Sequence, residues 1–403
     1  MNPDDQSSAA AADYHIWRKR VVTLVGRSYS VATKPGLLGH GRDDVASRLL
    51  AACVPVDAGS TVVQMQCGSG LFGAVAAGSH GAAHVWLTDR SVVGVEAARR
   101  TLRLNVITNA TVVAGHGSSA LDPALRADTV ALRIPTEKQA LLQLLADAFA
   151  ILKVGGRCAL AGATNEGIKS AAGALAALFG NVTVLGTDSG HRVVLSVKRA
   201  PTVSDTTVLT NAFLAHDAFH PLDVIVRGVP LSLCSRPGVF SWEHLDEATA
   251  VLADVMDVRS GDTVLDLGCG TGALGIRAAQ LSGTGHVALV DVDLDAIRCV
   301  ERSIANAGLR TCTAISSDVA AAVRDQQFDL VVTNPPFHVG KATALDVPAQ
   351  FILDAWHVLR HGGRLNLVAN RTLPYERLVH EQFGNLAMPY DGPRFKVLTA
   401  TKR

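Results

Sequence analysis

Residues 266–272 read DLGCGTG and are the stretch best suited to holding a ligand. They end an apolar run and precede a helical pattern, so we expect them to form the turn from a strand into a helix. Glycines at positions 268, 270 and 272 let the backbone turn sharply and approach a ligand closely. A dinucleotide-binding fold or a plain tight turn has the same pattern, so this turn alone does not identify the ligand.

Aspartates follow the strands expected beside this turn. Asp291 ends the next apolar run, 25 positions after Asp266, where a carboxylate can accept both ribose hydroxyls of a bound adenosine. Asp293 is better explained as the cap of the next helix. Asp318 follows the third run and can accept the adenine amino group, and its alternative is an ordinary aspartate of a surface loop. Together these positions predict an adenosine-containing ligand.

Phosphate-binding signals are missing from the sequence around the turn. There is no G-K-S/T of the kind that marks a phosphate-binding loop. A nucleoside without phosphates, such as S-adenosylmethionine, therefore fits the site better.

Residues 334–337 read NPPF and directly follow the apolar run Phe328–Thr333. The two prolines stiffen the backbone just after the Asn334 side chain. An exocyclic amino group is a poor nucleophile because its lone pair is delocalised. If the Asn334 side-chain oxygen and the Pro335 carbonyl accept its protons, the lone pair is localised and aimed at a methyl group. Phe337 can stack on a planar substrate, and the structural alternative is a turn with a buried phenylalanine.

Strands and helices must alternate to position these two loops. Helical patterns mostly separate the short β-branched runs of the second half, which predicts a mainly parallel sheet covered by helices on both sides. In such sheets ligands bind at the carboxyl ends of the strands, where both loops lie. The expected strands are Thr263–Leu267, His286–Val290, Cys312–Ser316, Phe328–Thr333, Arg364–Val368 and Phe395–Ala400.

The chain contains an internal repeat. Residues 61–70 and 263–272 match without gaps at an offset of 202, and the same offset relates residues 34–38 to 236–240 and 84–89 to 286–291. The repeat is much longer than a solenoid or propeller module, so it indicates domain duplication. We expect two domains, 1–200 and 201–403, which agrees with the length of 403 residues.

Composition excludes several classes of protein. The net charge of +1 gives no bulk attraction for nucleic acid or an anionic membrane, so any polyanion must meet a local patch. The seven cysteines are scattered and never form a C-x-x-C pair, which argues against disulfides and a zinc site. No stretch suits a signal peptide or a membrane span. We expect a cytoplasmic protein without a metal centre.

The second half resembles the class I methyltransferases that modify amino groups, whose fourth motif is N/D-P-P-Y/F. More narrowly, it is similar to the bacterial ribosomal RNA guanine-N2 methyltransferases, which pair a degenerate N-terminal copy with an active C-terminal copy. The similarity covers nearly all of residues 230–403. It is carried by the stretches 237–241, PGVFS; 334–338, NPPFH; 362–363, GG; 368–370, VAN; 373–375, LPY; and 394–397, RFKV.

The resemblance implies an α/β fold of two tandem class I (Rossmann-like) methyltransferase domains, each a mainly parallel seven-stranded sheet with helices on both faces. It also implies that the first domain supports folding and holds RNA, and that S-adenosylmethionine supplies a methyl group to a guanine N2 of 16S or 23S ribosomal RNA. The candidate cofactor-binding residues are Asp266, Gly268, Gly270, Gly272, Asp291 and Asp318. The candidate catalytic residues are Asn334, Pro335, Pro336 and Phe337.

The first copy is expected to be inactive. In the alignment Gln64 stands opposite Asp266, and Gln66 stands opposite Gly268. These changes remove a carboxylate and place a long side chain where the cofactor would approach. With an offset of 201, Arg133 takes the place of Asn334.

Asp89 survives opposite Asp291 in the first copy. Basic residues of that copy, in the segments 17–20 and 99–103, can contact RNA phosphates, although ordinary solvated faces explain them equally well. The sequence does not say whether they form one patch.

Three other functions fit parts of the pattern. Related N-P-P-Y loops serve glutamine methylation in proteins and adenine methylation in DNA, but here Phe337 ends the motif and the duplicated domain favours RNA. A ribosome-assembly factor without activity would not need the complete set of loop residues. A nicotinamide oxidoreductase would need a phosphate-binding turn. The expected partner is ribosomal RNA or a ribosomal subunit, with no membrane.

Overall fold

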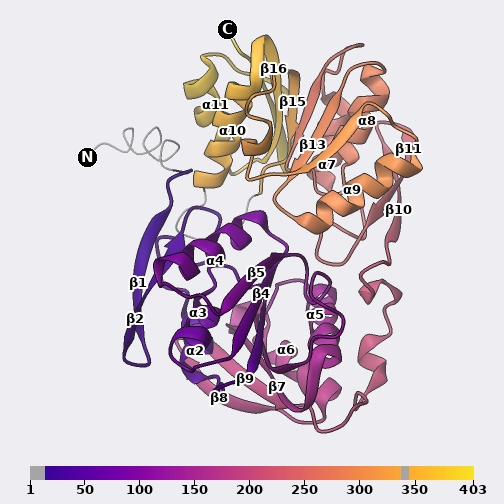
Figure 1. Ribbon diagram of the computed structural model, residues 1–403. Coiled ribbons are helices and arrows are strands. Elements are labelled where there is room, and N and C mark those ends of the chain that lie inside the picture. Colours follow the sequence, from indigo (N-terminus) through magenta and orange to yellow (C-terminus); the bar gives the residue numbers. More distant parts are fainter. Residues whose placement is uncertain (1–13, 337–344) are drawn as a thin grey trace. The chain divides into compact units, whose positions relative to one another are not determined.

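The computed structural model describes residues 14–336 and 345–403, and the chain divides into two compact units (Figure 1). The first unit is Trp17–Ala218. The second unit is Phe219–Arg403 together with the N-terminal segment that ends at Ile16.

The first unit begins with a hairpin and continues as alternating strands and helices. Its elements are β1 (Arg18–Leu24), β2 (Arg27–Thr33), α2 (Val45–Cys53), β3 (Thr61–Met65), α3 (Leu71–Gly78), β4 (His84–Asp89), α4 (Val92–Leu104), β5 (Ala110–Ala114), β6 (Ala127–Arg133), α5 (Lys138–Ile151), β7 (Leu152–Ala163), η1 (Thr164–Glu166), α6 (Ile168–Phe179), β8 (Thr183–Asp188), β9 (His191–Val197), η2 (Thr206–Leu209) and η3 (Ala212–Leu214).

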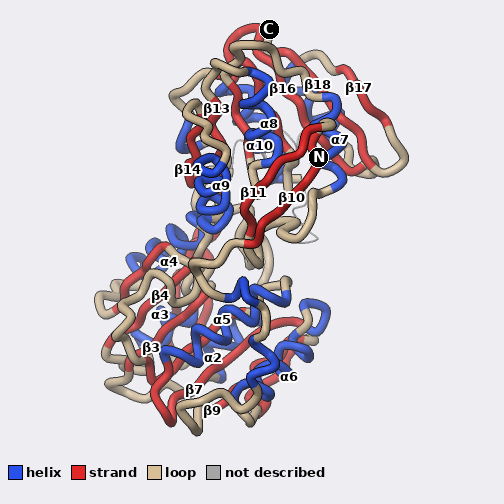
Figure 2. The backbone as a smooth tube through the Cα atoms, turned by 90° about the vertical axis from the view of Figure 1, so that its right-hand side faces the viewer, coloured by secondary structure: helices blue, strands red, loops and turns tan. Residues whose placement is uncertain are grey.

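The second unit repeats this plan and also begins with a hairpin, which Figure 2 shows as β10 and β11. Its elements are β10 (His220–Val226), β11 (Val229–Ser235), α7 (Glu247–Val255), β12 (Val264–Leu267), α8 (Ala273–Ser282), β13 (Val287–Asp291), α9 (Leu294–Asn306), β14 (Cys312–Ser316), η4 (Ala321–Val323), β15 (Phe328–Thr333), α10 (Asp346–Val358), β16 (Leu359–Asn370), α11 (Tyr375–Phe383), β17 (Ala387–Asp391) and β18 (Phe395–Thr401).

Each unit has a seven-stranded sheet of the same strand order. The order is β5-β4-β3-β6-β7-β9-β8 in the first unit and β14-β13-β12-β15-β16-β18-β17 in the second. In both sheets the first five strands are parallel, and the last two pairings are antiparallel. The carboxyl ends of β12, β13 and β15 therefore lie at one edge of the second sheet, which brings the glycine-rich turn and the proline loop together.

Helices cover both faces of each sheet because the central strands are apolar on both sides. In β12, Val264 belongs to the core cluster that contains side chains of α7, α8 and α9, whereas Leu265 belongs to the cluster that contains side chains of α10 and α11. In β3, Val62 and the following residue Val63 likewise belong to two different core clusters, one on each face of the sheet. The predicted fold class is thus confirmed.

The end of the first unit lies beyond the boundary near residue 200 that the sequence indicates. Residues 201–218 pack on the first unit through their polar and apolar side chains. Gln143 Nε2 donates to the Leu214 carbonyl at 2.6 Å, and His216 Nε2 lies 2.8 Å from the Asp147 carboxylate. The Leu214 side chain is buried in the same unit. These contacts place the boundary of the compact unit after Ala218.

Tyr14 fastens the N-terminal segment to the second unit. Its ring is 3% exposed and shares a core cluster with Val319 and Phe351. Its hydroxyl donates to Asp318 Oδ1 at 2.9 Å. Asp318 lies in the loop that follows β14, so a residue far away in the sequence holds the carboxylate that the sequence analysis assigns to adenine.

We expect Tyr14→Phe to loosen this loop and Tyr14→Ala to loosen it more. Loss of the hydroxyl should lower the local opening free energy by about 1 kcal/mol, and loss of the buried ring by about 3 kcal/mol. Hydrogen–deuterium exchange of residues 312–320 measures this directly. Tyr29→Phe is the matched control, because the buried Tyr29 hydroxyl bonds Ser79 within the first unit. Unchanged exchange of residues 312–320 in Tyr14→Ala would contradict the role of Tyr14.

Candidate active site

The glycine-rich turn joins β12 to α8 and requires glycine at all three predicted positions. Gly268, Gly270 and Gly272 have φ angles of +75°, +51° and +82°, a region that side chains disfavour. A Cβ atom at Gly268 would lie 2.9 Å from Phe351 Cε1, and one at Gly272 would lie 2.9 Å from Val300 Cγ2. A Cβ atom at Gly270 would meet nothing within 4 Å, so there the backbone angle alone favours glycine.

Asp266 ties the end of β12 to the first turn of α8. Its side chain is 1% exposed, and Oδ2 accepts a hydrogen bond from the Gly275 backbone N–H at 2.7 Å. The pKa of Asp266 is raised to about 7, chiefly by burial and also by the nearby Asp291 carboxylate, whereas the bond from the Gly275 N–H lowers it. The sequence analysis assigns Asp266 to the cofactor without identifying this bond.

The first unit shows that an uncharged side chain suffices for the same bond. Gln64 occupies the equivalent place in β3, and its Oε1 accepts from the Gly73 N–H at 2.8 Å. The turn can therefore be held without a buried carboxylate and its desolvation cost. The bond to the helix does not itself require a carboxylate at position 266.

Asp291 ends β13 and is held against the glycine-rich turn. Its Oδ2 accepts from the Gly270 N–H and its Oδ1 from the Asp293 N–H, both at 2.9 Å. Asp293 caps α9 by accepting from the Asp295 N–H at 2.9 Å, which confirms the predicted cap. The turn and Asp291 thus form one rigid unit at the carboxyl edge of the sheet.

Asn334 follows β15 and has only its oxygen available. Its Nδ2 donates to Asp246 Oδ2 and to Thr249 Oγ1, each at 3.0 Å. A carboxylate only accepts hydrogen bonds, so the amide nitrogen must face Asp246 and both of its protons are used. Asn334 Oδ1 is buried and has no hydrogen-bond partner among residues 14–336 and 345–403. The geometry leaves an acceptor ready for a ligand that donates an N–H.

The two partners of Asn334 belong to the start of α7. Asp246 caps this helix by accepting from the Thr249 N–H at 2.9 Å. The sequence analysis does not single out either residue, although an aspartate three positions before a threonine at the start of an apolar pattern is a helix-capping signal. Pro335 is buried and Pro336 is exposed, whereas Phe337 lies outside the described residues.

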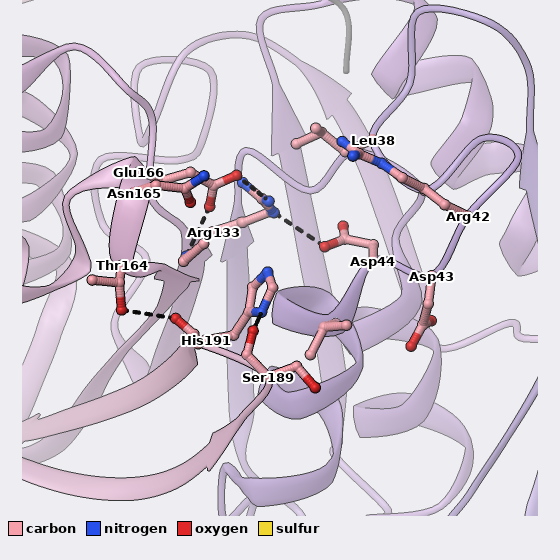
Figure 3. Close-up of a pocket in the computed structure, with 14 residues that line it drawn as sticks. Leu38, Arg42, Asp43, Asp44, Arg133, Thr164, Asn165, Glu166, Ser189 and His191 are labelled. Carbon is pink, nitrogen blue, oxygen red and sulfur yellow. Dashed lines mark hydrogen bonds and ion pairs between the residues drawn. The ribbon is translucent and has the colours of Figure 1, made fainter. Parts of the chain in front are cut away.

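In the first unit an arginine occupies the place of Asn334. Sheet pairing sets Gln64 beside Ala131 and Asp266 beside Val332, so Arg133 corresponds to Asn334. Figure 3 shows Arg133 in a pocket of about 530 Å³, between two carboxylates. Its Nε lies 3.2 Å from Asp44 Oδ1, and its Nη2 lies 2.8 Å from Glu166 Oε1.

A guanidinium only donates hydrogen bonds, so Arg133 cannot accept the protons of an amino group. Asp44 caps α2 just as Asp246 caps α7. The two copies differ in the partner of this aspartate, which is Arg133 in the first unit and Asn334 in the second. Gln66 stands in place of Gly268 with a φ angle of +48°. Asp89 keeps the bonds of Asp291, because it accepts from the Gly68 and Ser91 N–H groups, each at 2.8 Å.

A family comparison identifies the repeated unit. The model of the methyltransferase small domain matches residues 28–195 and 230–399, one range in each unit. The chain belongs to the methyltransferase small domain family. The family predicted from the sequence is confirmed.

The names of three similar proteins describe one activity, the methylation of small-subunit ribosomal RNA. The chain is 30% identical over 273 residues to ribosomal RNA small subunit methyltransferase C of Psychromonas ingrahamii, covering 68% of this chain and 75% of the relative. It is 31% identical over 283 residues to the protein of that name from Pseudomonas entomophila, covering 70% and 81%. The T. Thermophilus 16S rRNA N2 G1207 methyltransferase (RsmC), solved with AdoMet and guanosine, aligns with a TM-score of 0.80 and 28% identity, covering 98% of this chain and all of that one.

The described residues contain no helix of the length and hydropathy that a membrane crossing requires. Nor do residues 14–336 and 345–403 contain a group of three or more side chains arranged to hold a metal ion.

The raised pKa of Asp266 predicts that S-adenosylmethionine, a cation at sulfur, binds more tightly as the pH rises. The ionised fraction of a group with a pKa of about 7 rises about tenfold between pH 6 and pH 8, and we expect the affinity to rise by about this factor. The folded protein holds this proton more tightly than the unfolded chain does, so the contribution of Asp266 to stability falls as the pH rises from about 4 to about 7.

Isothermal titration with S-adenosylmethionine at several pH values tests this prediction. Asp266→Asn is the control, because its amide can still accept the Gly275 N–H as Gln64 accepts the Gly73 N–H. The variant should bind more weakly at pH 8 and lose the added pH dependence. Equal slopes for the wild type and the variant would exclude Asp266 as the titrating group.

Asp246 both caps α7 and orients the side-chain amide of Asn334, and Asp246→Asn should separate these two roles. Asparagine caps helices as well as aspartate does, so the thermal stability should stay the same. Its amide can also donate, so Asn334 is no longer forced into one orientation, and kcat should fall about tenfold to a hundredfold with unchanged affinity for the cofactor. Asp44→Asn, the same change in the first copy, should leave kcat unchanged. Steady-state methylation kinetics of the two variants decide the matter, and a wild-type kcat for Asp246→Asn would refute the orienting role.

Proposed function

We propose that this chain transfers the methyl group of S-adenosylmethionine to the exocyclic N2 amino group of a guanine in 16S ribosomal RNA. The observation that carries the proposal is the buried Oδ1 of Asn334, which has no hydrogen-bond partner in the described part of the chain, whereas the amide protons of Asn334 are donated to Asp246 and Thr249. An acceptor held in this way selects a substrate that donates an N–H. The guanine amino group is such a donor, and the names of the small-subunit methyltransferase relatives point to the RNA.

The second unit holds the reaction. Asn334 Oδ1 and the Pro335 carbonyl accept the two protons of the amino group and turn its lone pair out of conjugation with the ring. When bound, S-adenosylmethionine supplies an electrophilic methyl group on a sulfonium. The new N–C bond forms as the S–C bond breaks, and the amino group then releases one proton to solvent. Orientation in favourable cases contributes roughly 7 kcal/mol or more, so no strong base is required.

Cofactor binding is assigned to the carboxyl edge of the same sheet. The open backbone at Gly268, Gly270 and Gly272 leaves room for the ligand, and Asp266 supplies negative charge for its cationic part. Asp291 is assigned to the ribose hydroxyls, and Asp318, held by Tyr14, to the adenine amino group. Pro336 and Phe337 are assigned to the substrate from the sequence motif alone, because Phe337 lies outside the described residues.

The first copy is proposed to fold and hold RNA without binding the cofactor, so the unit Trp17–Ala218 supports the catalytic unit that contains Phe219–Arg403. Arg133 fills the acceptor position with an ion pair, and Gln64 removes the charge that Asp266 provides. A protein glutamine or a DNA adenine also donates N–H groups, but no relative compared above is named for either. A cytoplasmic location follows from a ribosomal RNA substrate.

Asn334→Ala should abolish methyl transfer and leave the affinity for S-adenosylmethionine within a few-fold of the wild type, because Asn334 contacts the substrate and not the cofactor. Nucleoside mass spectrometry of 16S and 23S ribosomal RNA from a deletion strain provides the measurement. We expect N2-methylguanosine of 16S RNA to fall in the deletion strain and to return with the wild-type gene but not with Asn334→Ala.

Two outcomes would count against the proposal. If both RNAs of the deletion strain keep their full N2-methylguanosine, the ribosomal substrate is wrong. If Asn334→Ala no longer binds the cofactor in a direct titration, the assignment of Asn334 to the substrate is wrong.

A further inference from the structure

A basic pocket of about 330 Å³ lies on the first unit, between the start of β1 and the end of α4. Four of the side chains that line it are cationic, and one is an indole. They come from two segments far apart in the sequence, which the fold brings together, and no acidic residue is among the described residues that line the pocket. The five are Trp17, Arg18, Lys19, Arg100 and Arg103.

The walls of the pocket are fixed by hydrogen bonds between β2 and α4. The Ala32 N–H donates to Thr101 Oγ1 at 3.0 Å. Asn105 accepts from the Ser30 N–H at 2.9 Å and donates to the Ser30 carbonyl at 2.8 Å. Because β1 pairs with β2 along its whole length, these bonds also hold the basic residues of β1 beside α4. The pocket is therefore present before any ligand arrives.

Positive charge exceeds negative charge at this place. Glu96 pairs with Arg100 Nε at 2.7 Å and with Arg103 Nη2 at 3.1 Å, and one carboxylate cannot neutralise both. Lys19 is exposed and adds a further cation on the opposite wall. The whole chain has a net charge of +1, so this excess is a local feature and not a property of the protein surface in general.

Trp17 gives the pocket a flat aromatic surface. The Arg100 guanidinium carbon lies 4.7 Å from the centre of the Trp17 ring, and the same guanidinium pairs with Glu96. Nucleobases stack on aromatic rings and on guanidinium planes, and phosphates pair with exposed lysine and arginine side chains. A site for a simple anion needs only the cations, whereas a ring held among cations suits a nucleotide.

We propose that this pocket is a second RNA contact, distinct from the active site, that binds a nucleotide of the substrate with its phosphates at Lys19 and Arg103 and its base against Trp17 and Arg100. The proposal deepens the assigned function and rests on an RNA substrate. The first copy lacks the catalytic residues, and the pocket gives it a specific surface for holding RNA instead.

The first test is the salt dependence of RNA binding to the full chain. Lys19→Gln combined with Arg103→Gln should weaken binding of a 16S RNA transcript about tenfold or more at moderate salt, because two phosphate contacts are lost. The slope of log affinity against log salt should fall by about 1.5 to 2. The KM for RNA should rise, while kcat at saturating RNA and the affinity for S-adenosylmethionine stay unchanged.

A charge-matched control separates the pocket from bulk charge. Lys138→Gln combined with Lys169→Gln removes the same two charges from exposed positions at the starts of α5 and α6 in the same unit. This variant should bind RNA with the wild-type slope. If both double variants lose the same affinity, or if neither loses any, the pocket is not an RNA contact.

Tryptophan emission reports on the pocket itself. A twenty-nucleotide poly(U) strand should quench the emission of the wild-type protein, and Trp17→Phe should remove most of this change because the other three tryptophans lie elsewhere in the sequence. Polyglutamate should cause no quenching. Equal binding of polyglutamate and poly(U) without quenching would show a site for acidic protein segments and overturn the proposal.

The two proposals can fail separately. Quenching of Trp17 by poly(U) in a protein that does not methylate ribosomal RNA would retain the pocket and reject the enzymatic function. Methylation with an unchanged KM for RNA in the Lys19 and Arg103 double variant would retain the function and reject the pocket.

Discussion

One hydrogen bond in each unit holds the end of the central strand to the helix that follows it. In the second unit it runs from the Gly275 N–H to Asp266, and in the first from the Gly73 N–H to Gln64. The bond sets the path of the glycine-rich turn, and the turn presents the Gly270 N–H to Asp291. The arrangement of the glycine-rich turn and Asp291 at the carboxyl edge of the sheet therefore depends on a side chain buried beneath them.

The two copies show which features belong to the fold and which belong to the chemistry. Both keep an aspartate as the cap of their first helix, because the backbone needs an acceptor there whatever the activity. The same carboxylate then orients an amide in one copy and neutralises Arg133 in the other. The change from asparagine to arginine replaces a hydrogen-bonded amide by an internal ion pair, and the helix cap is kept in both copies.

Local patterns explain why much of the fold could be predicted. The strands from 263 to 333 and the cap at Asp293 depend on residues within a few positions of one another. The edge strand β17 was not predicted because Pro389 interrupts its pattern, and proline is tolerated only where no ladder bond is needed. The partners of Asn334 and the docking of Tyr14 join residues 85 to 304 positions apart, which no local pattern reports.

The attachment of Tyr14 makes the first unit an insertion within the second. The chain starts in the second unit, leaves it after Ile16 and returns at Phe219. During synthesis, which proceeds from the N-terminus, the whole first unit emerges and can fold while Tyr14 has no core to join. The loop that carries Asp318 gains its contacts with Tyr14 only after the residues around Val319 and Phe351 have been made.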